Sequence, residues 1–156
     1  MSATGAEGQT RPSAGRSRNM SAIRRIDTAP ELLLRSRLHR AGLRFRKDYR
    51  LDVPSRRVRA DVVFTRPRVA VFVDGCFWNV CPLHGSQPKT NTSYWGAKLR
   101  RNRERDGEVN TALVAAGWVV VLIWEHVSVT EAVAEVKHVL EHRDRPPTVG
   151  RLVVIG

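Results

Sequence analysis

The chain has 156 residues and a formal net charge of +12 at pH 7, because 27 Lys and Arg outnumber 15 Asp and Glu. This length suits one domain, and the charge favours a polyanionic partner, although charge alone does not separate DNA from RNA or an anionic membrane. No apolar run reaches the length of a transmembrane helix and no secretory signal opens the chain, so a cytoplasmic protein without structural disulfides is expected.

The first 18 residues are rich in Ser, Gly, Ala, Thr and Arg and show no apolar periodicity. This composition predicts a disordered basic arm over residues 1–18. Its arginines, Arg11, Arg16 and Arg18, are candidates for phosphate contacts once DNA is present.

The first helix is expected over residues 29–41, with Asp27 or Thr28 as its cap and Gly42 after its end. Its inward stripe extends backwards to Glu31. A carboxylate in line with an apolar face must be exposed at the helix start, paired, or part of a site. The apolar members of that stripe are Leu34, Leu38 and Ala41.

The following segments predict a mixed sheet flanked by helices, because their order is β-β-α-β-α. Strands are expected over 58–64, 69–73, 118–124 and 152–155, the third central and buried, the last at an edge. Helices are expected over 93–116 and 130–142, and an irregular segment over 79–92.

The helix over 93–116 carries Asn102 and Asp106 on its apolar stripe. Burying either side chain without a partner would cost a few kcal/mol. Asp106 therefore either pairs with a structural arginine from the run 100–105 or belongs to a site. The other members of the stripe are Trp95, Leu99, Val109, Leu113 and Ala116.

Two aspartates lie on neighbouring predicted strands. Asp61 interrupts one strand, where Asp is rare, and Asp74 ends the next. Two close carboxylates repel each other unless they share a proton or a cation, and Mg²⁺ binds to one or two carboxylates with water and phosphate oxygens. In so basic a chain the pair favours phosphodiester hydrolysis. The alternative is a turn aspartate beside Gly75 and a salt-bridged Asp61.

A second group of residues has the spacing of a zinc site. Cys76, Cys81 and His84 are separated by four and two residues, which suits tetrahedral Zn²⁺. His126 is the best candidate for the fourth ligand. A closed site of this kind would be structural and would hold the irregular segment 79–92 to the sheet. The alternative is buried free thiols with surface histidines.

Aromatic residues flank the irregular segment: Phe77 and Trp78 precede it, and Tyr94 and Trp95 follow it. Aromatic side chains on irregular backbone beside basic residues are able to stack on bases or to wedge between base pairs. Packing in the core is the more usual fate of tryptophan and remains the alternative.

Taken together, these residues resemble the very short patch repair (Vsr) mismatch endonucleases. The resemblance covers residues 17–143, and its specificity comes from the ordered combination of short stretches. The matching stretches are 18–23, 27–31, 59–61, 71–78, 95–106, 116–118 and 123–126.

This resemblance implies a restriction-endonuclease-like αβα core over residues 19–156, with a structural zinc. It also implies Mg²⁺-dependent nicking of one DNA strand 5′ to the thymine of a T·G mismatch, the product of 5-methylcytosine deamination. The expected partner is double-stranded DNA, and the protein is expected to be a monomer associated with the nucleoid.

The resemblance also assigns roles to the acidic residues. Asp61 would be the principal Mg²⁺ ligand with the carbonyl of Val73, and Asp74 would occupy the next catalytic position. Glu31 and Asp106 would be supporting acids that orient metal-bound water. In the mechanism that these roles suggest, the basic residue Lys98 would either neutralise developing charge or hold a phosphate.

The remaining matched positions would bind DNA or zinc. Phe77, Trp78 and Trp95 correspond to the wedging aromatics, and Met20 with the arm to the segment that embraces the duplex. The other positions of this set are Arg18, Asn102 and Arg103 for DNA and Cys76, Cys81, His84 and His126 for zinc.

One position departs from the family pattern. Asn79 replaces a histidine that resembles a general base, and an amide does not accept a proton at neutral pH. This residue supports one alternative to the nicking enzyme, a mismatch-binding module without catalysis. Two further alternatives do not depend on Asn79: a nuclease for another modified site, and a structural RNA-binding protein.

Overall fold

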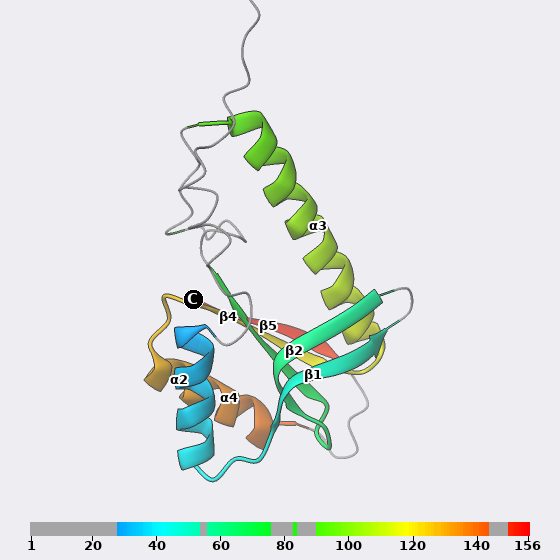
Figure 1. Ribbon diagram of the computed structural model, residues 1–156. Coiled ribbons are helices and arrows are strands. Elements are labelled where there is room, and N and C mark those ends of the chain that lie inside the picture. The colour runs from blue at the N-terminus through cyan, green and yellow to red at the C-terminus, as the bar shows by residue number, and fades with distance from the viewer. Residues whose placement is uncertain (1–27, 54–55, 76–82, 84–89, 144–149) are drawn as a thin grey trace, which may run out of the picture.

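The computed structural model describes residues 28–53, 56–75, 83, 90–143 and 150–156. In this part of the chain, Figure 1 shows three helices around one twisted sheet. The elements are α2 (Ala29–Arg40), β1 (Arg46–Val53), β2 (Arg56–Phe64), β3 (Val69–Asp74), α3 (Thr92–Ala115), β4 (Val119–Trp124), α4 (Val129–Glu141) and β5 (Arg151–Ile155). Among these described residues no helix is long and apolar enough to cross a membrane.

The five strands form one mixed sheet in the order β1-β2-β3-β4-β5. The first three are antiparallel neighbours, whereas β3, β4 and β5 run parallel. This arrangement confirms the predicted mixed sheet, with the apolar strand β4 inside it and β5 at one edge.

Helices cover both faces of the sheet, which gives the expected αβα layers. On one face, α2 and α4 pack against the strands through one cluster of buried residues. On the other face, the C-terminal half of α3 packs through a second cluster that includes Leu113 and Val120. The arrangement is consistent with an endonuclease-like fold.

The capping residues and the buried stripe predicted for α2 are found only in part. Thr28 occupies the N-cap, but its side chain accepts no capping hydrogen bond, and Gly42 follows the helix with φ of +81°. Leu34 and Leu38 are buried as expected. The inward placement of Ala41 was wrong: this residue is the C-cap and lies exposed, because the helical stripe ends one turn earlier.

Helix α3 extends well beyond the sheet at its N-terminal end (Figure 1). Only Leu99 and Leu113 of its predicted stripe are buried, while Asn102 and Asp106 are half-buried. Ala116 is exposed, contrary to prediction, because the helix ends at Ala115 and Gly117 adopts φ of +87°.

Strand β1 was not predicted. Its apolar residues Tyr49, Leu51 and Val53 alternate with charged residues, because one face packs inward and the other meets water. Asp48 interrupts the strand with φ of +46°, in the left-handed region that an aspartate occupies more readily than most residues.

The sheet divides beside Asp61. Strand β2 pairs with β3 only from Val62 to Phe64, whereas it pairs with β1 as far as Arg56. Strand β3 meanwhile continues beside β4 up to Asp74. We call this point, where β2 and β3 separate between Asp61 and Asp74, the strand fork.

Candidate active site at the strand fork

Asp61 uses its side chain where the β2–β3 ladder stops. Its Oδ2 accepts a hydrogen bond from the backbone N–H of Val73 at 2.7 Å. The carboxylate thereby takes the place of a backbone carbonyl acceptor and is fixed against β3. This explains an aspartate inside a strand, which sequence reasoning could only mark as unusual.

The environment of Asp61 disfavours its negative charge. Burial raises the pKa of this carboxyl from 3.8 to about 6, opposed by the hydrogen bond from Val73. The neighbouring carboxylates of Glu31 and Asp48 raise the pKa further, and the guanidinium of Arg35 lowers it. Asp61 is therefore a half-buried acid short of compensating positive charge.

Asp74 is perturbed more strongly. Burial raises its pKa from 3.8 to about 7, and the charges of Asp106 and Asp61 contribute in the same direction. Burial also raises the pKa of Asp106, against the effect of Arg105, whose Nε lies 3.9 Å from its Oδ1. The pairing of Asp106 with an arginine is thus real but incomplete.

Glu31 lies at the same end of the sheet. It is 4% exposed, and its Oε2 lies 3.6 Å from Nη2 of Arg35, itself 7% exposed. The Nε of Arg35 donates to the backbone carbonyl of Asp61 at 3.2 Å. The Glu31 carboxylate is therefore buried and paired, and its partner ties α2 to the residue at the fork.

Sequence reasoning missed Arg35, although its spacing of four residues from Glu31 is typical of a helical ion pair. It also missed Asp48, because β1 was not predicted. Asp48 stands opposite Asp61 in the register, between the pairs Lys47↔Val62 and Tyr49↔Ala60. Its Oδ2 lies 2.9 Å from Nη1 of Arg59.

The fork thus gathers acids from four elements: Glu31 on α2, Asp61 on β2, Asp74 on β3 and Asp106 on α3. Within the described ranges, no three His, Cys, Asp or Glu side chains approach closely enough to form a metal-binding group by themselves. Mg²⁺ does not require three protein side chains, since it keeps several waters and uses one or two carboxylates. Partly buried, mutually repelling carboxylates are suitable oxygen donors for such an ion.

The projecting half of α3 carries the other predicted residues of this helix. The Nζ of Lys98 lies 5.4 Å from the centroid of the Trp95 ring, and Asn102 follows one turn later. Lys98 precedes Asp106 by eight residues, about 12 Å along the helix axis. Of the two roles considered for Lys98, this position favours a phosphate contact. Arg103 is exposed on the same half.

Most of the predicted zinc and wedge residues lie outside the described residues. His126 is described: it is half-buried, and a Cβ added to Gly156 would lie 3.2 Å from its Nε2. The residues outside are Arg18, Met20, Cys76, Phe77, Trp78, Asn79, Cys81 and His84. The zinc site and the aromatic wedge therefore stay predictions.

Comparison with known proteins supplies the family. The family model "DNA mismatch endonuclease Vsr" matches residues 10–84. The type II nicking enzyme V.NaeI of Lentzea aerocolonigenes is 55% identical over 130 residues, covering 83% of this chain and 78% of that protein. The chain belongs to the Vsr family.

Other Vsr relatives span comparable parts of the chain. The DNA mismatch endonuclease Vsr of Escherichia coli K12 is 40% identical over 114 residues, 72% of this chain and 70% of that protein. The nicking enzyme V.XorIIP of Xanthomonas oryzae is 41% identical over 108 residues, 68% of this chain and 76% of that protein. The resemblance read from the sequence is therefore confirmed, and the Vsr match includes Glu31, Asp61 and Asp74.

Proposed function

We propose that this protein is a Mg²⁺-dependent DNA endonuclease that nicks one strand 5′ to the thymine of a T·G mismatch. The observation that carries the proposal is the placement of the half-buried carboxyls of Asp61 and Asp74 together at the strand fork, each with a raised pKa. The net charge of +12 and relatives named as nicking and mismatch endonucleases support DNA as the substrate.

Asp61 and the carbonyl of Val73 are the groups that would hold the magnesium ion. When bound there, Mg²⁺ polarises the scissile phosphate and lowers the pKa of a coordinated water. Asp74, with its pKa of about 7, exchanges a proton readily near neutral pH and is the best placed acceptor for the proton of the attacking water. Glu31 and Asp106 orient water around these two acids.

The DNA would lie along the projecting half of α3. Trp95, Lys98, Asn102 and Arg103 follow this half of the helix outward from Asp106. Phe77 and Trp78 would wedge beside the mismatch, where base stacking is easiest to disrupt. Met20 and Arg18 would approach the duplex from the other groove.

A structural zinc ion held by Cys76, Cys81, His84 and His126 would complete the protein. Neutral imidazole and thiolate ligands suit tetrahedral Zn²⁺, and only His126 belongs to the described residues. The protein would act as a monomer in the nucleoid, since a nick requires only one active site.

One residue favours a second candidate function. Asn79 stands where the family carries a histidine, so a protein that binds mismatched DNA without cutting it would show the same fork and the same basic surface. The two candidates differ in whether the protein nicks DNA, which without the histidine would depend on Asp74 as the proton acceptor.

The test is a strand-nicking assay on T·G, C·G and 5-methylcytosine duplexes, with Mg²⁺ or with EDTA. We expect nicking of the T·G duplex only with Mg²⁺, its loss in Asp61→Ala, and retained binding by that variant. Asn79→His is expected to nick faster than the natural chain, because imidazole accepts a proton at neutral pH.

Three outcomes would change the assignment. Cleavage that persists in Asp61→Ala would mean that the centre lies elsewhere. If the natural chain binds the T·G duplex without nicking it, and Asn79→His restores nicking, the natural protein is a mismatch-binding module. Equal cleavage of matched methylated duplex would show that the mismatch is not the substrate.

A further inference from the structure

Beyond the strand fork, β1 and β2 form a hairpin with two contrasting faces. Leu51, Val53, Val58 and Ala60 are buried on one face, in the same cluster as Leu113 of α3. In Figure 1 this hairpin lies across the C-terminal half of α3. Its orientation is therefore set by core packing.

The opposite face is charged and exposed. Arg59 stands directly across from Arg50, and Arg57 across from Asp52. The side chains of Arg50 and Arg59 are 55% and 62% exposed. We call the exposed surface formed by Arg50, Arg57 and Arg59 the arginine face.

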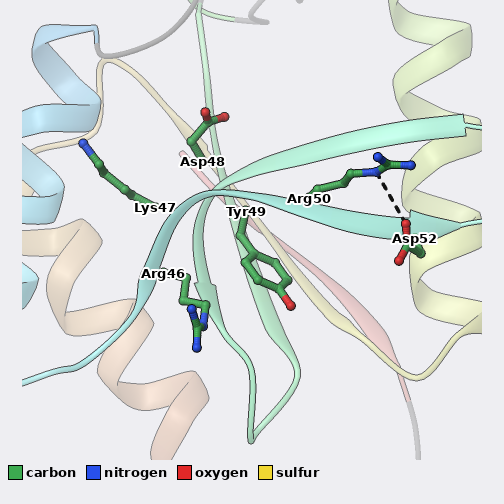
Figure 2. Close-up of a pocket in the computed structure, with 6 residues that line it drawn as sticks. All are labelled: Arg46, Lys47, Asp48, Tyr49, Arg50 and Asp52. Carbon is green, nitrogen blue, oxygen red and sulfur yellow. Dashed lines mark ion pairs between the residues drawn. The ribbon is translucent and has the colours of Figure 1, made fainter.

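Two arginines opposed across a hairpin repel each other and reduce its stability. In the protein alone, aspartates relieve this repulsion: Arg50 lies 3.5 Å from Asp52, and Arg59 lies 2.9 Å from Asp48. Figure 2 shows the first of these ion pairs and shows Asp48 pointing away from Tyr49. Ion pairs this exposed contribute about 0–1 kcal/mol each, so a stronger anion displaces them easily.

The arginine face begins at the candidate active site. Asp48 is bonded by Arg59 and is close enough to Asp61 to raise its pKa, so Arg59 and Asp61 are separated by one side chain. Residues 57 and 59 share a face and lie about 7 Å apart along the strand. This step is comparable with that between neighbouring phosphates of one DNA strand.

We propose that the arginine face binds the phosphates of the DNA strand flanking the scissile phosphate. This inference rests on the proposed function and adds a second contact surface to the projecting half of α3. Guanidinium groups on a hairpin fixed by core packing give phosphate contacts in a defined register. The phosphates would replace Asp48 and Asp52 as partners of Arg59 and Arg50.

The test compares two charge-matched double variants. Arg50→Gln with Arg57→Gln removes two charges from the arginine face and keeps Arg59 beside Asp48. Arg37→Gln with Arg40→Gln removes two exposed charges from the last turn of α2, which Figure 1 places away from the end of β3. Thermal unfolding first establishes that both variants fold.

The measurement is the affinity for a T·G duplex in EDTA as a function of NaCl concentration. Each phosphate contact contributes about 0.9 to the slope of log affinity against log salt concentration, so the hairpin variant should lose about 1.8 of that slope. The α2 variant should keep the slope of the natural chain. Wild-type affinity should also fall when the duplex is shortened on one flank of the mismatch, and the hairpin variant should be insensitive to that shortening.

Equal losses in the two variants would overturn the proposal, because they would show a general effect of charge. An unchanged slope in the hairpin variant would also overturn it. If the natural chain itself fails to bind the duplex, the proposed function fails first, and this outcome is seen before either variant is compared.

Discussion

At the scale of single residues, the decisive feature is a set of acids held where their charges are unfavourable. Asp61 and Asp74 are both half-buried, and the surroundings of each raise its pKa. Such residues cost stability and are expected where function requires them. Their protonation therefore makes stability depend on pH in a direction opposite to that of an ordinary salt-bridged aspartate.

This leads to a prediction for Asp74→Asn in EDTA. Because the pKa of Asp74 in the folded protein, about 7, exceeds its ordinary 3.8, the folded state holds the proton more tightly, and the free energy of unfolding falls as pH rises from about 4 to 7. Asparagine has no proton to lose. The variant should therefore match the natural chain near pH 4 and be more stable by about 4 kcal/mol at pH 8.

Urea unfolding at both pH values measures this difference. Asp52→Asn is the matched control, since it makes the same replacement at a side chain that is 93% exposed. An Asp74→Asn variant that is less stable than the natural chain at pH 8 would contradict the prediction.

Residue positions were partly predictable from the sequence. Asp61 and Asp74 were marked by an aspartate inside one strand and another at a strand end, and Glu31 by its place on an apolar stripe. The hydrogen bond from Arg35 to the carbonyl of Asp61 and the position of Asp48 opposite Asp61 were not predictable, because both depend on how separate elements are placed. The zinc ligands Cys76, Cys81 and His84 remain predictions of spacing alone.

At the scale of elements, local sequence determined most boundaries to within a residue or two. Alternation and capping predicted β2, β3, β4, α3 and α4, whereas β1 was missed because five of its eight residues are charged. The exposed half of α3 shows that an apolar stripe does not by itself tell which part of a helix packs. Two glycines test these influences separately: Gly107 lies inside α3, where helix propensity decides, and Gly117 follows α3, where backbone conformation decides.

Two glycine substitutions should therefore change stability in opposite directions. Gly107 lies inside α3 and a Cβ there would meet nothing within 4 Å, so Gly107→Ala should raise the free energy of unfolding by about 0.5–1 kcal/mol. Gly117 has φ of +87° and a Cβ there would lie 3.3 Å from Arg68 Nη1, so Gly117→Ala should lower it by about 1 kcal/mol or more. Denaturant unfolding measures both, and changes of the same sign would refute this account of α3.

At the scale of the whole molecule, the order of elements predicted a mixed sheet with helices on both faces. It did not predict the strand fork, because the point where β2 leaves β3 depends on Asp61 replacing a backbone acceptor. The fork separates two surfaces, the projecting half of α3 and the arginine face. DNA placed at the fork would meet both, and the N-terminal arm would supply a third set of contacts.

The contribution of the arm is measured with a chain that begins at Met20. It lacks Arg11, Arg16 and Arg18, so three phosphate contacts would be lost and the salt slope of DNA binding should fall by about 2.7. The stability of the domain should not change, because the composition of residues 1–18 predicts a disordered arm. A full-length chain with these arginines replaced by glutamine should show the same loss if charge is responsible. A slope equal to that of the natural chain would place the arm away from the DNA and leave the fork and its two flanking surfaces to account for binding.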